Sequence, residues 1–116
     1  MSPCVLIVED NAELRQAMSR LLQKCGFEVV EAGSVHEALL LVDRSSHILL
    51  DLRLPDGSGV EVLEYIRARD TSQRVMVVTG EGEEGPLLTA AALLSPDAVL
   101  RKPVTDFEQI QTWLCA

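Results

Sequence analysis

The chain has 116 residues, enough for one domain with a single core and too few for a catalytic domain joined to an output domain. Its net charge of −8 and the lack of a basic stripe argue against binding to nucleic acid or to an anionic membrane, because both require Lys and Arg to neutralise phosphates. Cys4, Cys25 and Cys115 have no ligand spacing, which favours reduced thiols over a disulfide framework or a zinc site. The first apolar stretch is interrupted by Glu9-Asp10, so we expect neither a leader nor a membrane span, and a cytoplasmic protein fits best.

Apolar runs of strand length alternate with segments of helical periodicity along the whole chain. We predict strands over 4–9, 27–31, 47–52, 74–79 and 97–101. Helical stripes follow over 14–22, 38–42 and 60–66, with a fourth helix over about 85–94 after a loop at 80–85. This alternation is typical of βα units wound into a parallel sheet, and no repeat or linker divides residues 1–116.

The fourth helix, and a fifth helix that we expect after the last strand, lead to specific predictions. Thr105 and Glu108 have the spacing of a capping box, which predicts that the fifth helix opens at Thr105 or Asp106. The fourth helix bears no charge, and a helix that is apolar on all sides is usually covered on all sides. We expect a partner or dimer face there, formed by Leu87, Leu88, Leu93 or Leu94 beside Val99; the alternative is that its alanines form an inoffensive exposed surface.

Polar side chains follow four of the predicted strands. Glu9-Asp10 follows the first strand, Asp51 ends the third, Thr79 ends the fourth and Lys102 follows the fifth. Parallel strands that are covered on both faces gather their ligands beyond their carboxyl ends, so these groups should converge on one edge of the sheet. Three acids, one hydroxyl and one ammonium resemble a divalent-cation site combined with a phosphoryl site.

The chemistry of this set favours phosphoryl transfer. Mg²⁺ prefers oxygen ligands, and convergent carboxylates repel one another unless a cation joins them. An aspartate can act as a nucleophile toward a phosphoryl group, and the remaining requirement is neutralisation of the phosphoryl oxygens. Taken alone, Glu9-Asp10 could serve a helix dipole and Asp51 could cap a loop, but those alternatives give no reason for Lys102 to join them.

With these residues in place, the chain resembles the receiver domain of two-component response regulators (the CheY-like superfamily) over its whole length. Five motifs in the same order carry the resemblance: Glu9-Asp10, Asp51, the loop 54–59, Thr79 and Lys102-Pro103. The resemblance implies a flavodoxin-like (βα)5 α/β fold with a five-stranded parallel sheet in the order 2-1-3-4-5. It also implies a Lys102–Pro103 bond that is typically cis.

The same resemblance implies a function in phosphorelay signalling. Asp51 would accept a phosphoryl group from a histidine kinase or a histidine phosphotransfer protein, with Thr79 as the switch hydroxyl and Lys102 as the phosphoryl-binding cation. Mg²⁺ would be held by Glu9, Asp10, Asp51 and the backbone carbonyl of Arg53. No enzymatic activity is expected beyond self-catalysed phosphoryl transfer and autodephosphorylation, and a homodimer or effector would bind the face formed by the fourth helix, fifth strand and fifth helix.

One departure from the family pattern keeps an alternative open. Val99 stands where receivers commonly carry an aromatic residue, and a β-branched valine has no ring whose position could report on Thr79. A degenerate receiver that acts as a phosphate-independent interaction module is therefore the alternative. A phosphatase of the haloacid-dehalogenase type is disfavoured, because its paired aspartates normally follow the first strand whereas Asp51 follows the third.

Overall fold

A computed structural model describes residues 4–69, 72–80, 82 and 85–116. Within these ranges, five parallel strands form one sheet in the order β2-β1-β3-β6-β7. The strands are β1 (Cys4–Val8), β2 (Glu28–Ala32), β3 (His47–Leu50), β6 (Arg74–Thr79) and β7 (Ala98–Arg101). A short antiparallel hairpin of β4 (Arg53–Leu54) and β5 (Gly57–Ser58) follows β3. Counted along the parallel strands alone, this is the predicted order 2-1-3-4-5, and the flavodoxin-like fold is confirmed.

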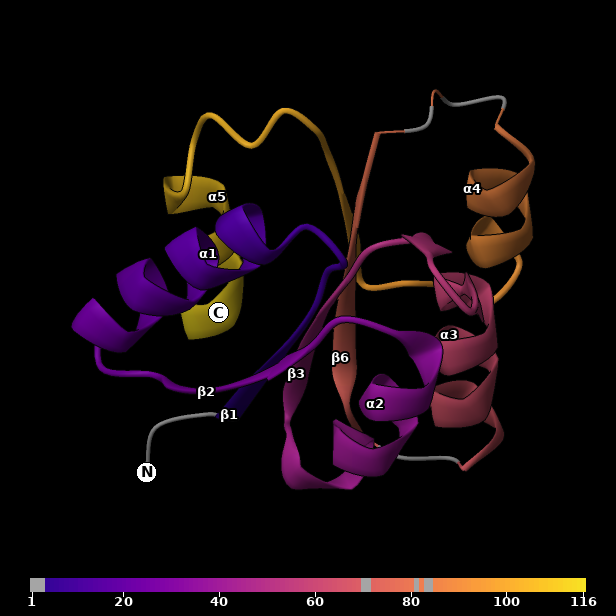
Figure 1. Cartoon of the computed structure of the whole chain (residues 1–116), viewed down its shortest axis with the longest axis horizontal. Coiled ribbons are helices and arrows are strands. Elements are labelled where there is room, and N and C mark those ends of the chain that lie inside the picture. Colours follow the sequence, from indigo (N-terminus) through magenta and orange to yellow (C-terminus); the bar gives the residue numbers. More distant parts are fainter. Residues whose placement is uncertain (1–3, 70–71, 81, 83–84) are drawn as a thin grey trace.

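Helices cover both faces of the sheet (Figure 1). On one face lie α1 (Ala12–Lys24) and α5 (Glu108–Cys115), and on the other lie α2 (Val35–Leu41), α3 (Gly59–Ala68) and α4 (Pro86–Ala92). A short 3-10 turn, η1 (Val42–Arg44), follows α2. Alternate residues of the central strands point into two separate apolar clusters, one under each helical layer. This two-sided burial explains why β1 and β3 are apolar on nearly every residue.

The strand register brings the predicted site residues to the same edge of the sheet. Val8 pairs with both Ala32 and Leu50, and Thr79 pairs with Arg101. Glu9, Asp51 and Lys102 directly follow residues of these pairs. They therefore lie at the same end of the sheet as Thr79. The core fixes this register, because a slip of one residue would exchange the apolar sets of the two faces.

The fifth helix begins later than we predicted. It starts at Glu108 instead of Thr105 or Asp106, with Phe107 as its N-cap residue. The Asp106 side chain accepts a hydrogen bond from the Glu108 N–H at 2.9 Å, so a local Asx turn replaces the expected capping box. A capping box does occur at the start of α3, between Ser58 and Glu61.

The uncharged fourth helix is buried along one side only. Leu88 and Ala91 lie in the core, and Leu87 and Leu94 pack against it in part. Leu93, by contrast, is 84% exposed at the end of the helix. The single chain therefore leaves the other side of the helix for the predicted partner face, and among the four leucines of that face Leu93 is the one that extends into solvent.

In the part of the chain that the structure describes, every helix is too short or too polar to cross a membrane. Residues 81, 83 and 84 of the predicted loop at 80–85 lie outside the described residues.

Candidate functional site

The three predicted acids converge at the carboxyl ends of β1 and β3. Glu9 and Asp51 are buried, whereas Asp10 is exposed beside them. Each residue offers one carboxylate oxygen, and these oxygens all lie within 4.8 Å of one another. Backbone hydrogen bonds fix both buried acids, since the Glu9 N–H donates to the Ala32 carbonyl at 3.0 Å and the Asp51 N–H donates to the Val8 carbonyl at 2.9 Å.

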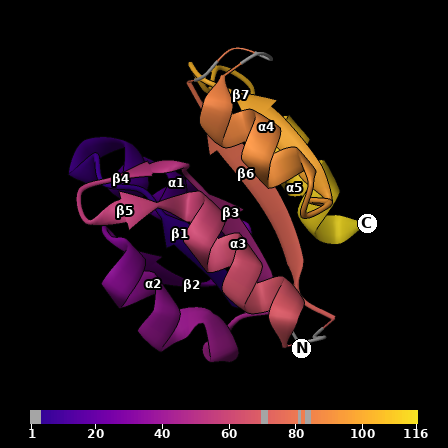
Figure 2. The same ribbon diagram turned by 90° about the vertical axis from the view of Figure 1, so that its right-hand side faces the viewer.

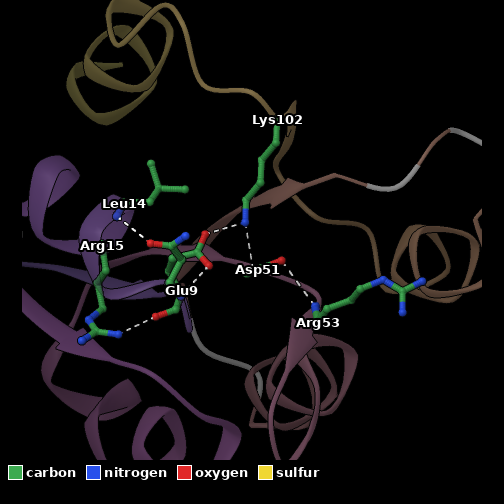
Figure 3. Close-up of polar contacts among 7 residues, drawn as sticks. Glu9, Leu14, Arg15, Asp51, Arg53 and Lys102 are labelled. Atoms are coloured by element: carbon green, nitrogen blue, oxygen red, sulfur yellow. Dashed lines mark hydrogen bonds and ion pairs between the residues drawn. The ribbon is translucent and has the colours of Figure 1, made fainter.

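Lys102 joins the two buried carboxylates. Its Nζ lies 2.6 Å from Glu9 Oε1 and 3.0 Å from Asp51 Oδ2 (Figure 3). The Lys102 N–H donates to the Thr79 carbonyl at 2.8 Å, which ties the lysine to the end of β6. The bond from Lys102 to Pro103 is cis, as the resemblance implied.

Burial sets the electrostatics of this cluster. Burial raises the pKa of Glu9 to about 7; the adjacent Asp51 adds to this, while the Lys102 ammonium opposes it. Burial alone would lower the pKa of Lys102, but the Glu9 and Asp51 carboxylates outweigh it and raise that pKa. The Lys102 ammonium thus pairs with two buried carboxyl groups, and Asp10 lies beside them. Three acids near one ammonium favour the binding of an additional cation.

An open pocket of about 460 Å³ gives solvent access to this cluster. Its lining comprises Asp10, Asp51, Arg53, Thr79, Gly80 and Lys102. The backbone N–H of Arg53 donates to Asp51 Oδ1 at 3.3 Å, while the Arg53 side chain extends away from the carboxylates (Figure 3). The structure therefore brings Asp51, Thr79, Lys102, Asp10 and Arg53 around one opening, with Glu9 in contact with Lys102.

Two neighbours of the acidic pair were not predicted from sequence. Arg15 on α1 donates to the Glu9 carbonyl at 2.7 Å, and its Nε lies 3.0 Å from Glu31 Oε1 on β2. Asn11 caps α1 by accepting from the Leu14 N–H, and its own N–H donates to Glu9 Oε2 at 3.2 Å. Asparagine directly before a helical stripe is a recognisable N-cap signal, but nothing in the sequence alone indicates that Arg15 reaches Glu9.

This donor set suits Mg²⁺. The ion is hard, prefers oxygen, and is usually held by one or two carboxylates with water and phosphate completing its shell. Carboxylate oxygens from Glu9, Asp10 and Asp51 lie within reach of one another and of an open pocket. The residues present therefore fit a divalent cation.

Comparison with known proteins identifies the family. Residues 5–114 match the response regulator receiver domain family. The chain is 37% identical over 101 residues to the acid tolerance regulatory protein ActR of Rhizobium meliloti, covering 85% of this chain and 52% of that protein. It is 41% identical over 108 residues to the sensory transduction protein RegX3 of Mycolicibacterium smegmatis, covering 91% of this chain and 46% of that one. The chain thus spans about half the length of these curated relatives.

Solved structures agree with this assignment. A CheY-like response regulator receiver domain protein from Methanospirillum hungatei superposes with a TM-score of 0.88 at 26% identity, covering 99% of this chain and 95% of that one. A response regulator from Burkholderia pseudomallei, solved with a phosphorylated aspartic acid and a calcium ion, superposes with a TM-score of 0.85 at 26% identity, covering 97% of this chain and 66% of that one. The chain belongs to the response regulator receiver domain family.

Proposed function

We propose that residues 1–116 form one receiver domain that accepts a phosphoryl group on Asp51. The observation that carries this proposal is the ion pair between a buried Asp51 carboxylate and the Lys102 ammonium, both of which line an open pocket. A buried nucleophile with a cation at 3.0 Å is arranged to receive a group that brings negative charge. A solvated surface carboxylate would need neither feature.

The transfer step follows from these residues. An Asp51 carboxylate oxygen attacks the phosphorus of a phosphohistidine, so that an O–P bond forms as the N–P bond breaks. The electron pair of the broken bond returns to the imidazole, which takes up a proton. Lys102 then pairs with a phosphoryl oxygen, and the Thr79 hydroxyl donates to another. Hydrolysis of the acyl phosphate by water returns Asp51 to its original state, and no turnover of a separate substrate is proposed.

Asp10, Asp51 and the Arg53 carbonyl, supported by Glu9, are the groups that would hold Mg²⁺. The bound ion would supply positive charge near the phosphoryl oxygens, because the Lys102 ammonium alone does not balance their negative charge. The Burkholderia relative, with its phosphorylated aspartic acid and calcium ion, supports both the acceptor chemistry and the presence of a divalent cation.

The proposed phosphoryl donor is a histidine kinase or a histidine phosphotransfer protein, and the proposed output is a change in partner or dimer contacts. The surface for that output is formed by α4, β7 and α5, where Leu93 is 84% exposed and Val99 is 46% exposed. Val99 was the sole basis for the degenerate alternative. The grouping of Asp51, Thr79 and Lys102 around one pocket gives that alternative no support.

The direct test is the intact mass of the protein after incubation with acetyl phosphate and Mg²⁺. We expect a single phosphoryl adduct that is absent from Asp51→Asn and from a sample that contains a chelator. A folded wild-type chain that forms no adduct, or an Asp51→Asn variant that forms the same adduct, would contradict the proposal.

A further inference from the structure

The β4–β5 hairpin follows Asp51, and its turn is hydrogen-bonded to the start of α2. Arg53 pairs with Ser58 and Leu54 with Gly57, which leaves Pro55 and Asp56 as the turn. A two-stranded hairpin of this length is not stable in isolation, so its position depends on what holds it from outside. Its base carries Arg53, whose N–H donates to Asp51 Oδ1.

The attachment is made by the carboxylate of Asp56. Asp56 Oδ1 accepts from the Val35 N–H at 2.7 Å, and Oδ2 accepts from the His36 N–H at 3.0 Å. These are N–H groups of the first turn of α2, which have no partner within the helix. The hydrogen bonds from His36 and Val35 lower the pKa of Asp56, so the carboxylate is ionised at neutral pH. Figure 2 shows the β4–β5 hairpin beside the start of α2.

The helix that Asp56 contacts, α2, follows a strand that is hydrogen-bonded to Glu9 of the acidic site. α2 begins three residues after Ala32, the last residue of β2, whose carbonyl accepts from the Glu9 N–H at 3.0 Å. Gly57 also packs close to α2, since a Cβ built on it would lie 3.4 Å from Val35 Cγ2. Asp56 therefore connects the segment that carries Arg53 with the segment that anchors Glu9.

We propose that Asp56 is a positioning residue for cation binding: its carboxylate holds the β4–β5 hairpin against α2 and so fixes the Arg53 backbone beside Asp51. The inference rests on the proposed function, in which the Arg53 carbonyl is a ligand for Mg²⁺. Groups that orient metal ligands without touching the metal commonly change affinity by 10- to 100-fold when they are removed. Asp56 would act in this way through the hairpin.

The chain offers a matched control at the same helix end. Ser34 Oγ accepts from the Glu37 N–H at 3.1 Å, so it also caps the first turn of α2, and the hydrogen bonds described for its hydroxyl are made to Glu37 and not to the hairpin. Ser34→Ala and Asp56→Ala therefore both remove capping from α2, but only Asp56→Ala removes the hydrogen bonds between the hairpin turn and that helix. Asp56→Asn retains one acceptor oxygen and should give an intermediate effect.

The test is the Mg²⁺ dissociation constant, measured by titration calorimetry for the wild-type chain and the three variants. We expect Asp56→Ala to bind Mg²⁺ about tenfold more weakly and Ser34→Ala to stay within about twofold of wild type. Without Mg²⁺, amide hydrogen exchange at Arg53 should accelerate in Asp56→Ala and not in Ser34→Ala. Saturating Mg²⁺ should restore phosphorylation of Asp56→Ala, because Asp51 and Lys102 are unchanged.

The outcomes separate this inference from the function on which it rests. Equal weakening of Mg²⁺ binding in Ser34→Ala and Asp56→Ala, or wild-type affinity and Arg53 exchange in Asp56→Ala, would overturn the positioning role alone. A wild-type chain that binds no Mg²⁺ would overturn the proposed cation site and this inference together.

Discussion

Substitution of Gly59 by alanine should disturb the backbone of the phosphoacceptor directly. Gly59 is the first residue of α3 and is buried, and its N–H donates to the Leu52 carbonyl at 2.9 Å. A Cβ built on Gly59 would lie 2.2 Å from the Asp51 carbonyl oxygen and 3.0 Å from both Asp51 C and Leu52 Cα. Since these are backbone atoms and the optimal separation of such atoms is about 3.5 Å, the start of α3 or the Asp51 peptide must move by about 1 Å.

The magnitude follows from this displacement. Overpacking of a buried site typically costs about 1–3 kcal/mol, and the better helix propensity of alanine offsets at most about 1 kcal/mol of that. We therefore expect Gly59→Ala to lower the free energy of unfolding by about 1–2 kcal/mol and the melting temperature by about 4–8 °C. Phosphorylation by acetyl phosphate should slow by up to about 100-fold, because a reacting group moved by about 1 Å can lose that much.

Gly82→Ala provides the control, because a Cβ built on Gly82 meets no atom of the residues that the structure describes within 4 Å. The assays are thermal unfolding followed by circular dichroism and the rate of adduct formation followed by intact mass. If Gly59→Ala melts and reacts like Gly82→Ala, the reasoning from this close approach is refuted.

Three further results are expected. Lys102→Ala should still accept some phosphoryl group but should lose the phosphorylation-dependent change in partner binding or self-association; a normal response would refute the role of Lys102. Without divalent cation, the folded chain holds the Glu9 proton up to about pH 7 whereas the unfolded chain releases it near 4.5, so raising the pH between these values should destabilise the fold by up to about 3 kcal/mol. Urea unfolding at several pH values should show that this loss of stability is absent from Glu9→Gln. The same loss in Glu9→Gln as in wild type would contradict the raised pKa of Glu9. Leu93→Glu should weaken phosphorylation-dependent self-association or partner binding in sedimentation assays, while Leu40→Glu, at another exposed leucine, should not; equal behaviour of the two variants would remove Leu93 from the interface.

The sequence was sufficient to predict the sheet and the residues at its edge, because both depend on the same pattern. Continuous apolar runs identify strands covered on both faces, and the chain order of the parallel strands places Glu9, Asp51, Thr79 and Lys102 at equivalent ends. The register then brings them together without any further information from side chains.

The features missed from sequence depend on how separate elements meet. The contact of Arg15 with the Glu9 carbonyl requires the angle at which α1 leaves β1, and the bonds from Asp56 to α2 require the position of a hairpin that has no apolar stripe of its own. The start of α5 was misplaced because Asp106 competes locally with Thr105 for the first turn. Local turn chemistry and packing between elements decide such details.

The most direct test of the central claim is the position of the phosphoryl group. Borohydride reduction of the phosphorylated protein converts an aspartyl phosphate to homoserine, which peptide mass mapping can locate. The proposal predicts homoserine at position 51 and at no other carboxylate. Homoserine at Asp10 or another acid in place of Asp51, or a phosphoryl adduct that yields no homoserine, would contradict it.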